Sequence, residues 1–196
     1  MIKGEEKSMN SIKNRLAALV AVIAIAASAA FAAPTKNGEK TPLTREQIVK
    51  KVRKELVTLP WYGVFDNLSY KVEGDTVTLY GQVVRPTTRS DAARRVAQIP
   101  GVTRVVNQIE VLPLSPFDDE LRERTYRSVF NTGGLYRYAM SANPSIHIIV
   151  NRGHVTLEGV VANKMDKQLA YMAARSVGSF SVTNNLRAER GENELY

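Results

Sequence analysis

Hydrophobic side chains recur along this chain with two spacings, one typical of helices and one typical of strands. The first helical stripe runs from Ile48 to Leu56, and Thr44 with Gln47 forms a capping box just before it. Alternating apolar positions follow at 68–72 and 77–83, which predicts two strands. The order of the elements therefore begins as helix, strand, strand.

The same part of the chain continues with a second helix and a third strand. Helical spacing of small apolar residues at 92–97 predicts the helix, and Pro100-Gly101 ends it. Alternation at 105–111 then predicts one continuous third strand. The complete pattern is α-β-β-α-β.

The second half of the chain shows this pattern again. Its first helix starts at Ser115-Pro116, and apolar positions at 146–150 and 155–161 predict two strands. A helix over 169–177 and a strand over 182–186 complete the order. The second half therefore predicts α-β-β-α-β as well.

Short sequence blocks also repeat. Val-Thr-Leu-Tyr-Gly at 77–81 recurs as Val-Thr-Leu-Glu-Gly at 155–159, 78 residues later. Val-Val-Asn at 105–107 recurs as Val-Thr-Asn at 182–184, 77 residues later. Two blocks in the same order at nearly the same distance indicate an internal duplication.

The predicted fold is α+β, with two tandem α-β-β-α-β modules, each a small three-stranded sheet covered by two helices. The modules cover 43–113 and 114–189, with a flexible linker at 33–42 and a tail at 190–196. The connection at 112–116 is short and rich in proline. We therefore expect the two modules to pack together.

The N-terminal residues predict export. Lys13 and Arg15 precede the apolar run 16–27, and small residues follow it, which is typical of a secretory signal peptide. We expect the peptide 1–32 to be cleaved after Ala32 and the mature protein to lie in the periplasm. The alternative is that the apolar run is retained as a membrane anchor.

The composition excludes some kinds of functional site and favours some kinds of partner. The chain has no cysteine, which excludes disulfides, a thiol nucleophile and a thiolate metal site. Its net charge of +8 favours anionic partners. Because the protein is expected to be exported, anionic lipid or an envelope polymer is a better candidate than nucleic acid, which is not expected as a partner.

The repeated blocks resemble a known domain. Residues 74–83 and 153–161 resemble the signature of the BON domain, and 101–109 is similar to its closing segment. The whole chain resembles the tandem BON proteins of the periplasm, which include osmotically inducible ones. This resemblance implies non-catalytic binding modules, some of which bind phospholipid. It implies no catalytic residue and no cofactor. Gly81 and Gly159 match the motif glycine, for which we expect a backbone role.

The second copy departs from the family pattern in two places. One is Ser179-Phe180-Ser181, and the other is the long stretch 131–145 between its first helix and first strand. These departures bear on the detailed function of the second copy more than on its fold.

A basic and aromatic segment at 122–138 is the candidate binding site. Arginine and aromatic side chains on one edge suit an anionic membrane surface, where rings lie at headgroup depth and guanidinium groups meet phosphates. The alternative is that the aromatic residues close the core. The candidate lipid-binding residues are Arg122, Arg124, Tyr126, Arg127, Phe130, Tyr136, Arg137 and Tyr138.

Two further groups of residues have open interpretations. The apolar stretch 60–65 fits core packing, contact between modules or a lipid wedge, and the arginines at 85–95 fit a solvated basic face. If Asn151-Arg152 is a hairpin turn, His147 and His154 lie within diagonal reach on one face. A metal site would need a third ligand such as Glu158, and we predict none.

The sequence therefore predicts a non-catalytic periplasmic protein that binds anionic phospholipid and supports envelope integrity or stress tolerance. The alternative is a structural module that docks on an envelope protein or on peptidoglycan. No enzyme motif occurs in the chain, and its oligomeric state stays open.

Overall fold

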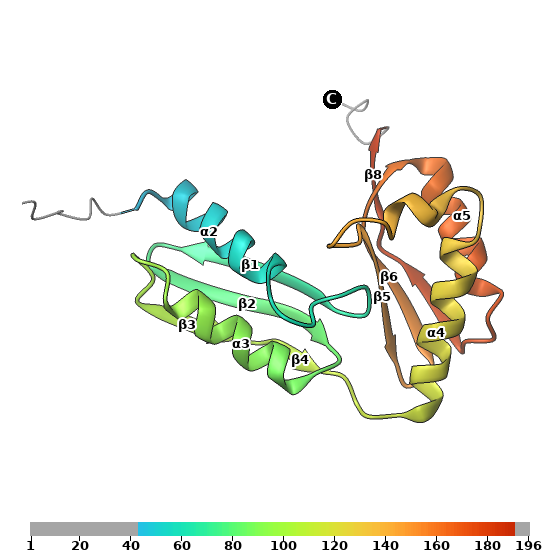
Figure 1. Ribbon diagram of the computed structural model, residues 1–196, viewed down its shortest axis with the longest axis horizontal. Helices are drawn as coiled ribbons and strands as arrows, with labels where there is room; N and C mark the ends of the chain where they lie inside the picture. Colours follow the sequence, from blue (N-terminus) through green and yellow to red (C-terminus); the bar gives the residue numbers. More distant parts are fainter. Residues whose placement is uncertain (1–42, 191–196) are drawn as a thin grey trace, which may run out of the picture. The chain divides into compact units, whose positions relative to one another are not determined.

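The computed structural model describes residues 43–190 and contains two α-β-β-α-β modules in tandem (Figure 1). The predicted α+β fold of two repeated modules is confirmed. The predicted signal peptide, its cleavage after Ala32 and the linker lie outside the described residues, as does the tail from residue 191.

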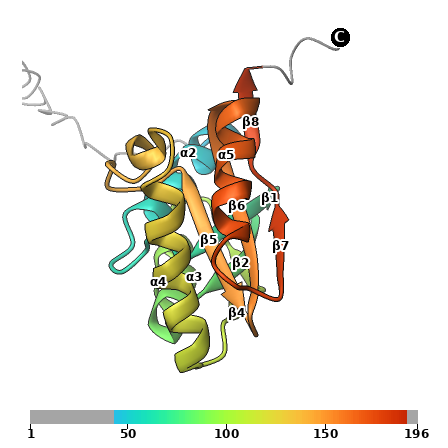
Figure 2. The ribbon, with the colours of Figure 1, turned by 90° about the vertical axis from the view of Figure 1, so that its right-hand side faces the viewer.

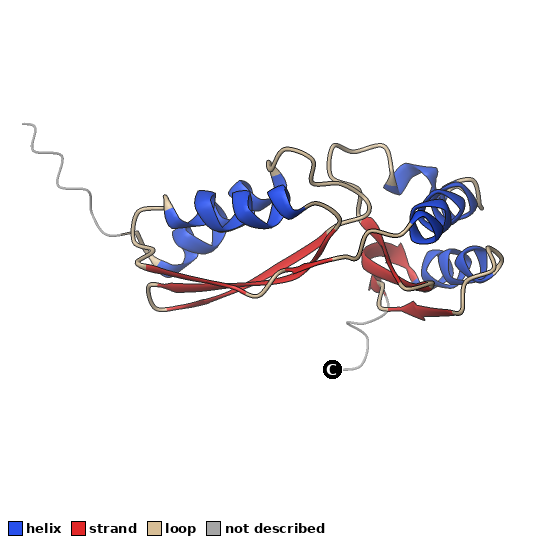
Figure 3. Ribbon diagram, turned by 90° about the horizontal axis from the view of Figure 1, so that it is seen from below, coloured by secondary structure: helices blue, strands red, loops and turns tan. Residues whose placement is uncertain are grey.

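The first module is a mixed sheet built around its second strand. Its elements are α2 (Arg45–Val57), β1 (Asn67–Glu73), β2 (Thr76–Val83), α3 (Pro86–Ala97), β3 (Arg104–Asn107) and β4 (Glu110–Val111). Strand β2 pairs antiparallel with β1 and parallel with β3 and β4. Both helices lie on one face of the sheet (Figure 3), so the core forms between helices and sheet.

The second module repeats this plan. Its elements are α4 (Pro116–Phe130), the short 3-10 helix η1 (Leu135–Tyr138), β5 (Ile146–Asn151), β6 (His154–Asn163), α5 (Lys164–Arg175), β7 (Ser181–Asn184) and β8 (Arg187–Arg190). Strand β6 pairs antiparallel with β5 and parallel with β7 and β8. Helices α4 and α5 pack side by side over this sheet (Figure 2).

The third strand of each module is broken, which corrects the prediction of one continuous strand. In the first module the Asn107 side-chain oxygen accepts the N–H of Ile109 at 3.1 Å, and its amide donates to the Arg89 carbonyl at 3.0 Å. Asn184 makes the same two bonds in the second module, to Leu186 and Lys167. The asparagine side chain replaces a strand bond and turns the backbone, which alternation alone does not reveal.

Gly81 and Gly159 occupy equivalent backbone positions. Their φ angles are +114° and +119°, a region in which L side chains are strained. A Cβ added to Gly81 would lie 2.0 Å from the carbonyl oxygen of Asn67, and one added to Gly159 would lie 2.1 Å from that of Ser145. Each glycine therefore lets two neighbouring strands approach where a side chain would separate them.

Local capping positions the helices as their sequences indicate. The Thr44–Gln47 capping box is present at α2, and Ser115 caps α4 by accepting the Asp118 N–H at 3.2 Å. Within residues 43–190, no helix has the length and apolar content that crossing a bilayer requires.

Candidate functional site

Two of the predicted lipid-binding residues are buried. Arg122 lies inside the protein, where its Nη2 donates to the Val150 carbonyl at 2.9 Å and its Nη1 binds Asp119. Phe130 is part of the core of the second module. Neither side chain lies on the surface, because this face of α4 packs against β5 and the side chains serve the interior. For Phe130 this is the alternative in which the aromatic residues close the core.

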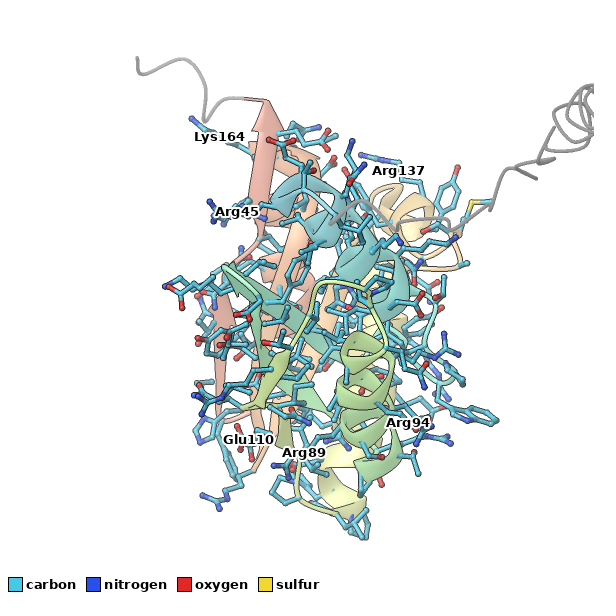
Figure 4. All side chains as sticks on the ribbon, turned by 90° about the vertical axis from the view of Figure 1, so that its left-hand side faces the viewer. Arg45, Arg89, Arg94, Glu110, Arg137 and Lys164 are labelled. Atoms are coloured by element: carbon cyan, nitrogen blue, oxygen red, sulfur yellow. The ribbon has the colours of Figure 1, made fainter. Side chains whose placement is uncertain are left out.

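The other arginines of the segment reach solvent but are paired with carboxylates, with Arg127 and Arg137 exposed and Arg124 half-exposed. Arg127 binds Glu123, and Arg124 lies 3.7 Å from Glu120, each one helical turn away. Arg137, labelled in Figure 4, binds Asp166. An exposed pair such as Arg127–Glu123 adds little stability, yet each of the three pairs offsets positive charge that would attract an anionic surface.

The tyrosines of the segment serve different purposes. Tyr138 is half-buried, its hydroxyl donating to Asp166 and accepting the Ala162 N–H at 2.8 Å. Burial alone would raise the pKa of Asp166, but the bonds from Tyr138 and Arg137 outweigh it and hold that pKa below its usual value. Tyr126 packs on Phe130, with ring centroids 4.8 Å apart. Tyr136 is 61% exposed and stays available for binding.

The two histidines do not form a metal site. The hairpin turn is at Arg152-Gly153, not one residue earlier, so His154 pairs with Asn151 and His147 pairs with Glu158. The rings are therefore four strand positions apart along the hairpin. The part of the chain from 43 to 190 contains no cluster of three metal-binding side chains.

His147 instead belongs to a contact between the modules. It is buried, its Nδ1 lies 3.3 Å from the Gly63 carbonyl, and its ring lies 5.6 Å from that of Tyr62. The Ile148 N–H donates to the Val64 carbonyl at 2.7 Å, and Val64 packs on the core of the second module. For this part of the stretch 60–65, contact between modules is the correct interpretation.

An exposed aromatic pair lies at the β5–β6 hairpin turn, outside the predicted segment. Phe117 lies in the first turn of α4 and Phe180 lies just before β7, and their rings stack with centroids 5.9 Å apart. Phe117 is 44% exposed and Phe180 is 73% exposed. The ring of His154 meets Phe180 edge-on at 5.8 Å. Large apolar rings held together in solvent are typical of an interaction surface.

The hairpin turn holds these rings in place. Buried Asp118 accepts the N–H groups of Arg152 at 2.8 Å and Gly153 at 2.7 Å, and the Phe180 N–H donates to the Gly153 carbonyl at 2.9 Å. A Cβ on Gly153 would lie 2.6 Å from the Phe180 ring and 3.2 Å from that of Phe117. The absence of a side chain on Gly153 therefore lets both rings lie against the turn.

Charge at this turn differs from that along α4. Arg152 is exposed, and no carboxylate of residues 43–190 forms an ion pair with it. We call Phe117, Arg152, His154 and Phe180 the tip patch. One signal in the sequence pointed to it, the departure from the family pattern at Ser179–Ser181, but its members come from three separate segments.

A family model describes the chain from 44 to 113 and again from 118 to 190, and that family is the BON domain. The chain belongs to the BON domain family. BON domains are non-catalytic binding domains that are typically periplasmic or associated with the cell envelope, and the family supports a phospholipid-binding role. A search of curated proteins gives no match.

Solved structures give a weaker comparison. The C-terminal domain of CdsD, a structural protein of the type III secretion system of Chlamydia trachomatis, is 10% identical with a TM-score of 0.29. The match covers 74% of this chain and 99% of that one. A second CdsD structure from the same organism is 10% identical over 73% of this chain and 93% of that one, with a TM-score of 0.27. Neither likeness bears on function at this level.

Proposed function

We propose that this protein is a non-catalytic periplasmic module pair that binds anionic phospholipid surfaces through the tip patch, supporting envelope integrity under stress. The observation that carries the proposal is the exposed Phe117–Phe180 stack next to Arg152, which has no ion pair within residues 43–190. Membership of the BON family and the net charge of +8 support the same partner.

The tip patch has the chemistry of a shallow membrane contact. Phenylalanine rings enter the boundary between headgroups and acyl chains, and a guanidinium group reaches the phosphates above it. Because both rings are already partly covered, burial contributes about 1–2 kcal/mol for each. Arg152 near an anionic surface contributes about 1 kcal/mol. The sum corresponds to weak, reversible binding that needs about millimolar lipid.

The test is flotation of the mature protein with vesicles of graded phosphatidylglycerol content in phosphatidylcholine. Flotation should rise with the anionic fraction, fall with added salt, and be strongly reduced in Phe117→Ser/Phe180→Ser. The matched control is Glu120→Gln/Glu123→Gln/Arg124→Gln/Arg127→Gln, which removes two ion pairs without changing the net charge and should float like the wild type. Loss of flotation in the control instead would return the site to the originally predicted segment.

One observation favours the alternative function, docking on an envelope protein. Met165 and Met172 lie seven residues apart on α5 and are 67% and 60% exposed, which gives this helix an adaptable apolar stripe. A protein partner from envelope extract that cross-links to the wild type but not to Met165→Gln/Met172→Gln would support it. In that case flotation would be absent with every lipid.

A further inference from the structure

Trp61 in the first module has an unusual backbone and an unusual exposure. It is the one tryptophan of the chain, its side chain is 68% exposed, and its φ is +69°. A non-glycine residue in this region is strained, and such strain persists only where the surrounding structure imposes it. Hydrophobic burial does not explain the position, because the ring faces solvent.

The neighbours of Trp61 impose this conformation. Leu59 is buried in the core, and the Tyr62 N–H donates to its carbonyl at 3.3 Å across the turn. Buried Asp66 then fixes the rest of the loop by accepting the N–H of Gly63 at 3.1 Å and that of Val84 at 2.8 Å. With the loop anchored on both sides, the indole is held outward rather than left to collapse on the core.

The indole is covered on one side by a cation. The guanidinium carbon of Arg85 lies 4.7 Å from the centroid of the Trp61 ring. Arg85 is exposed and has no ion pair with any carboxylate of the described part of the chain, and the first turn of α3 contains no acidic residue. Asp66 is close enough for the charge of Arg85 to act on its pKa, but its oxygens are occupied by the loop.

Arg85 is not an isolated charge. Arg89, four residues along α3 and labelled in Figure 4, is exposed and has no ion pair within residues 43–190. Further along the helix the arrangement changes, because Arg94 binds Asp91 and Arg95 lies 3.6 Å from Glu55. The unneutralised charge therefore gathers at the N-terminal end of α3, where Arg85 lies over the indole.

We infer that Trp61 and Arg85 form a second contact with anionic phospholipid, separate from the tip patch and located on the first module. The inference rests on the proposed function, since it names the same class of partner. An indole suits the headgroup region, where its ring lies among apolar groups and its N–H stays wet. A guanidinium stacked on that ring keeps its in-plane donors free for a phosphate.

Because Trp61 is the one tryptophan, its fluorescence reports on this contact alone. With vesicles of phosphatidylglycerol and phosphatidylcholine, its emission should shift to shorter wavelength, and brominated lipid should quench it. Arg85→Gln should weaken lipid partitioning about fivefold, the loss of roughly one cation at an anionic surface. Arg94→Gln, a paired arginine on the same helix, should leave the emission shift unchanged.

The outcomes separate this inference from the proposed function. In Phe117→Ser/Phe180→Ser, flotation should fall, but a higher lipid concentration should still shift the Trp61 emission. Wild-type flotation with unchanged Trp61 emission would overturn the second contact and leave the tip patch standing. An equal emission shift with pure phosphatidylcholine would overturn the role of Arg85. If the wild type neither floats nor shifts, both proposals fail together.

Discussion

The two modules share one fold but use the outer face of the first strand of the sheet differently. On β1, Ser69 and Lys71 point away from the core and are exposed. The equivalent residues on β5 are His147 and Ile149, and both are buried. Segment 62–64 of the first module contacts β5, so the outer face that is solvent-exposed in one copy is an internal contact in the other. The two copies therefore share the core side of the sheet and differ on its outer side.

The largest expected effect on stability tests the motif glycine that the two modules share. Gly81→Ala and Gly159→Ala should each destabilise their own module by about 3 kcal/mol or more, because the new Cβ would meet a carbonyl oxygen at a strained φ. Urea unfolding with hydrogen exchange resolved by module would measure this. Gly63→Ala, where a Cβ meets nothing within 4 Å, is the matched control. Equal stability of all three variants would contradict the backbone role.

The next largest effect on stability tests the outer face of the first strand, in which the two modules differ. Ile149→Lys gives β5 the residue that β1 has at the equivalent position, and it should cost about 3 kcal/mol, because it places a charged ammonium at a position that is 5% exposed. The reverse exchange, Lys71→Ile, should stay within about 0.5 kcal/mol, since that position is exposed. Thermal unfolding of both variants measures the difference. Similar costs would show that the two outer faces are equivalent after all.

The smallest expected effect is a pH dependence of the stability of the second module. Burial lowers the pKa of His147, and this outweighs the opposing influence of the Gly63 carbonyl and of the carboxylates of Asp66 and Glu158. The buried ring is therefore held neutral. Tyr62 beside it has its own pKa raised to about 12 by burial, so it carries no charge here.

The sign of that dependence follows from linkage. The contribution of His147 is fully present above the ordinary histidine pKa of about 6.5 and is lost as pH falls from there through its lowered folded value. Urea stability should decline by about 1 kcal/mol per pH unit at most over this window. His147→Phe should reduce the decline, whereas Ser69→His, exposed on β1, should add none. A decline unchanged in His147→Phe would assign it to other groups.

Local patterns predicted the architecture because each module is built from short-range rules. The stripe on α2, the alternation in β1 and β2, and the capping at Thr44 and Ser115 involve residues close in sequence. The repeated blocks then fixed the number of modules. The break in each third strand was missed, because Asn107 and Asn184 replace ladder bonds with side-chain bonds that alternation does not report.

The binding segment was predicted less well. Helical spacing placed Arg122 beside Tyr126, but it could not tell that Arg122 turns inward to the Val150 carbonyl. Arg124 and Arg127 had glutamates one turn before them, so their pairing was readable from the sequence. The Phe117–Phe180 stack was not readable, because the two rings are brought together by a hairpin between them in sequence.

The sequence by itself determined that the chain has two α+β modules of the BON family, where their glycines must lie, and that the chain carries excess positive charge. These properties depend on periodicity, local sterics and composition, which sequence states directly. Only the tertiary structure decided which cations remain unpaired and which rings remain exposed. Both depend on contacts between distant segments: Phe117 and Phe180 meet at a hairpin turn, and Arg85 reaches Trp61 across a loop.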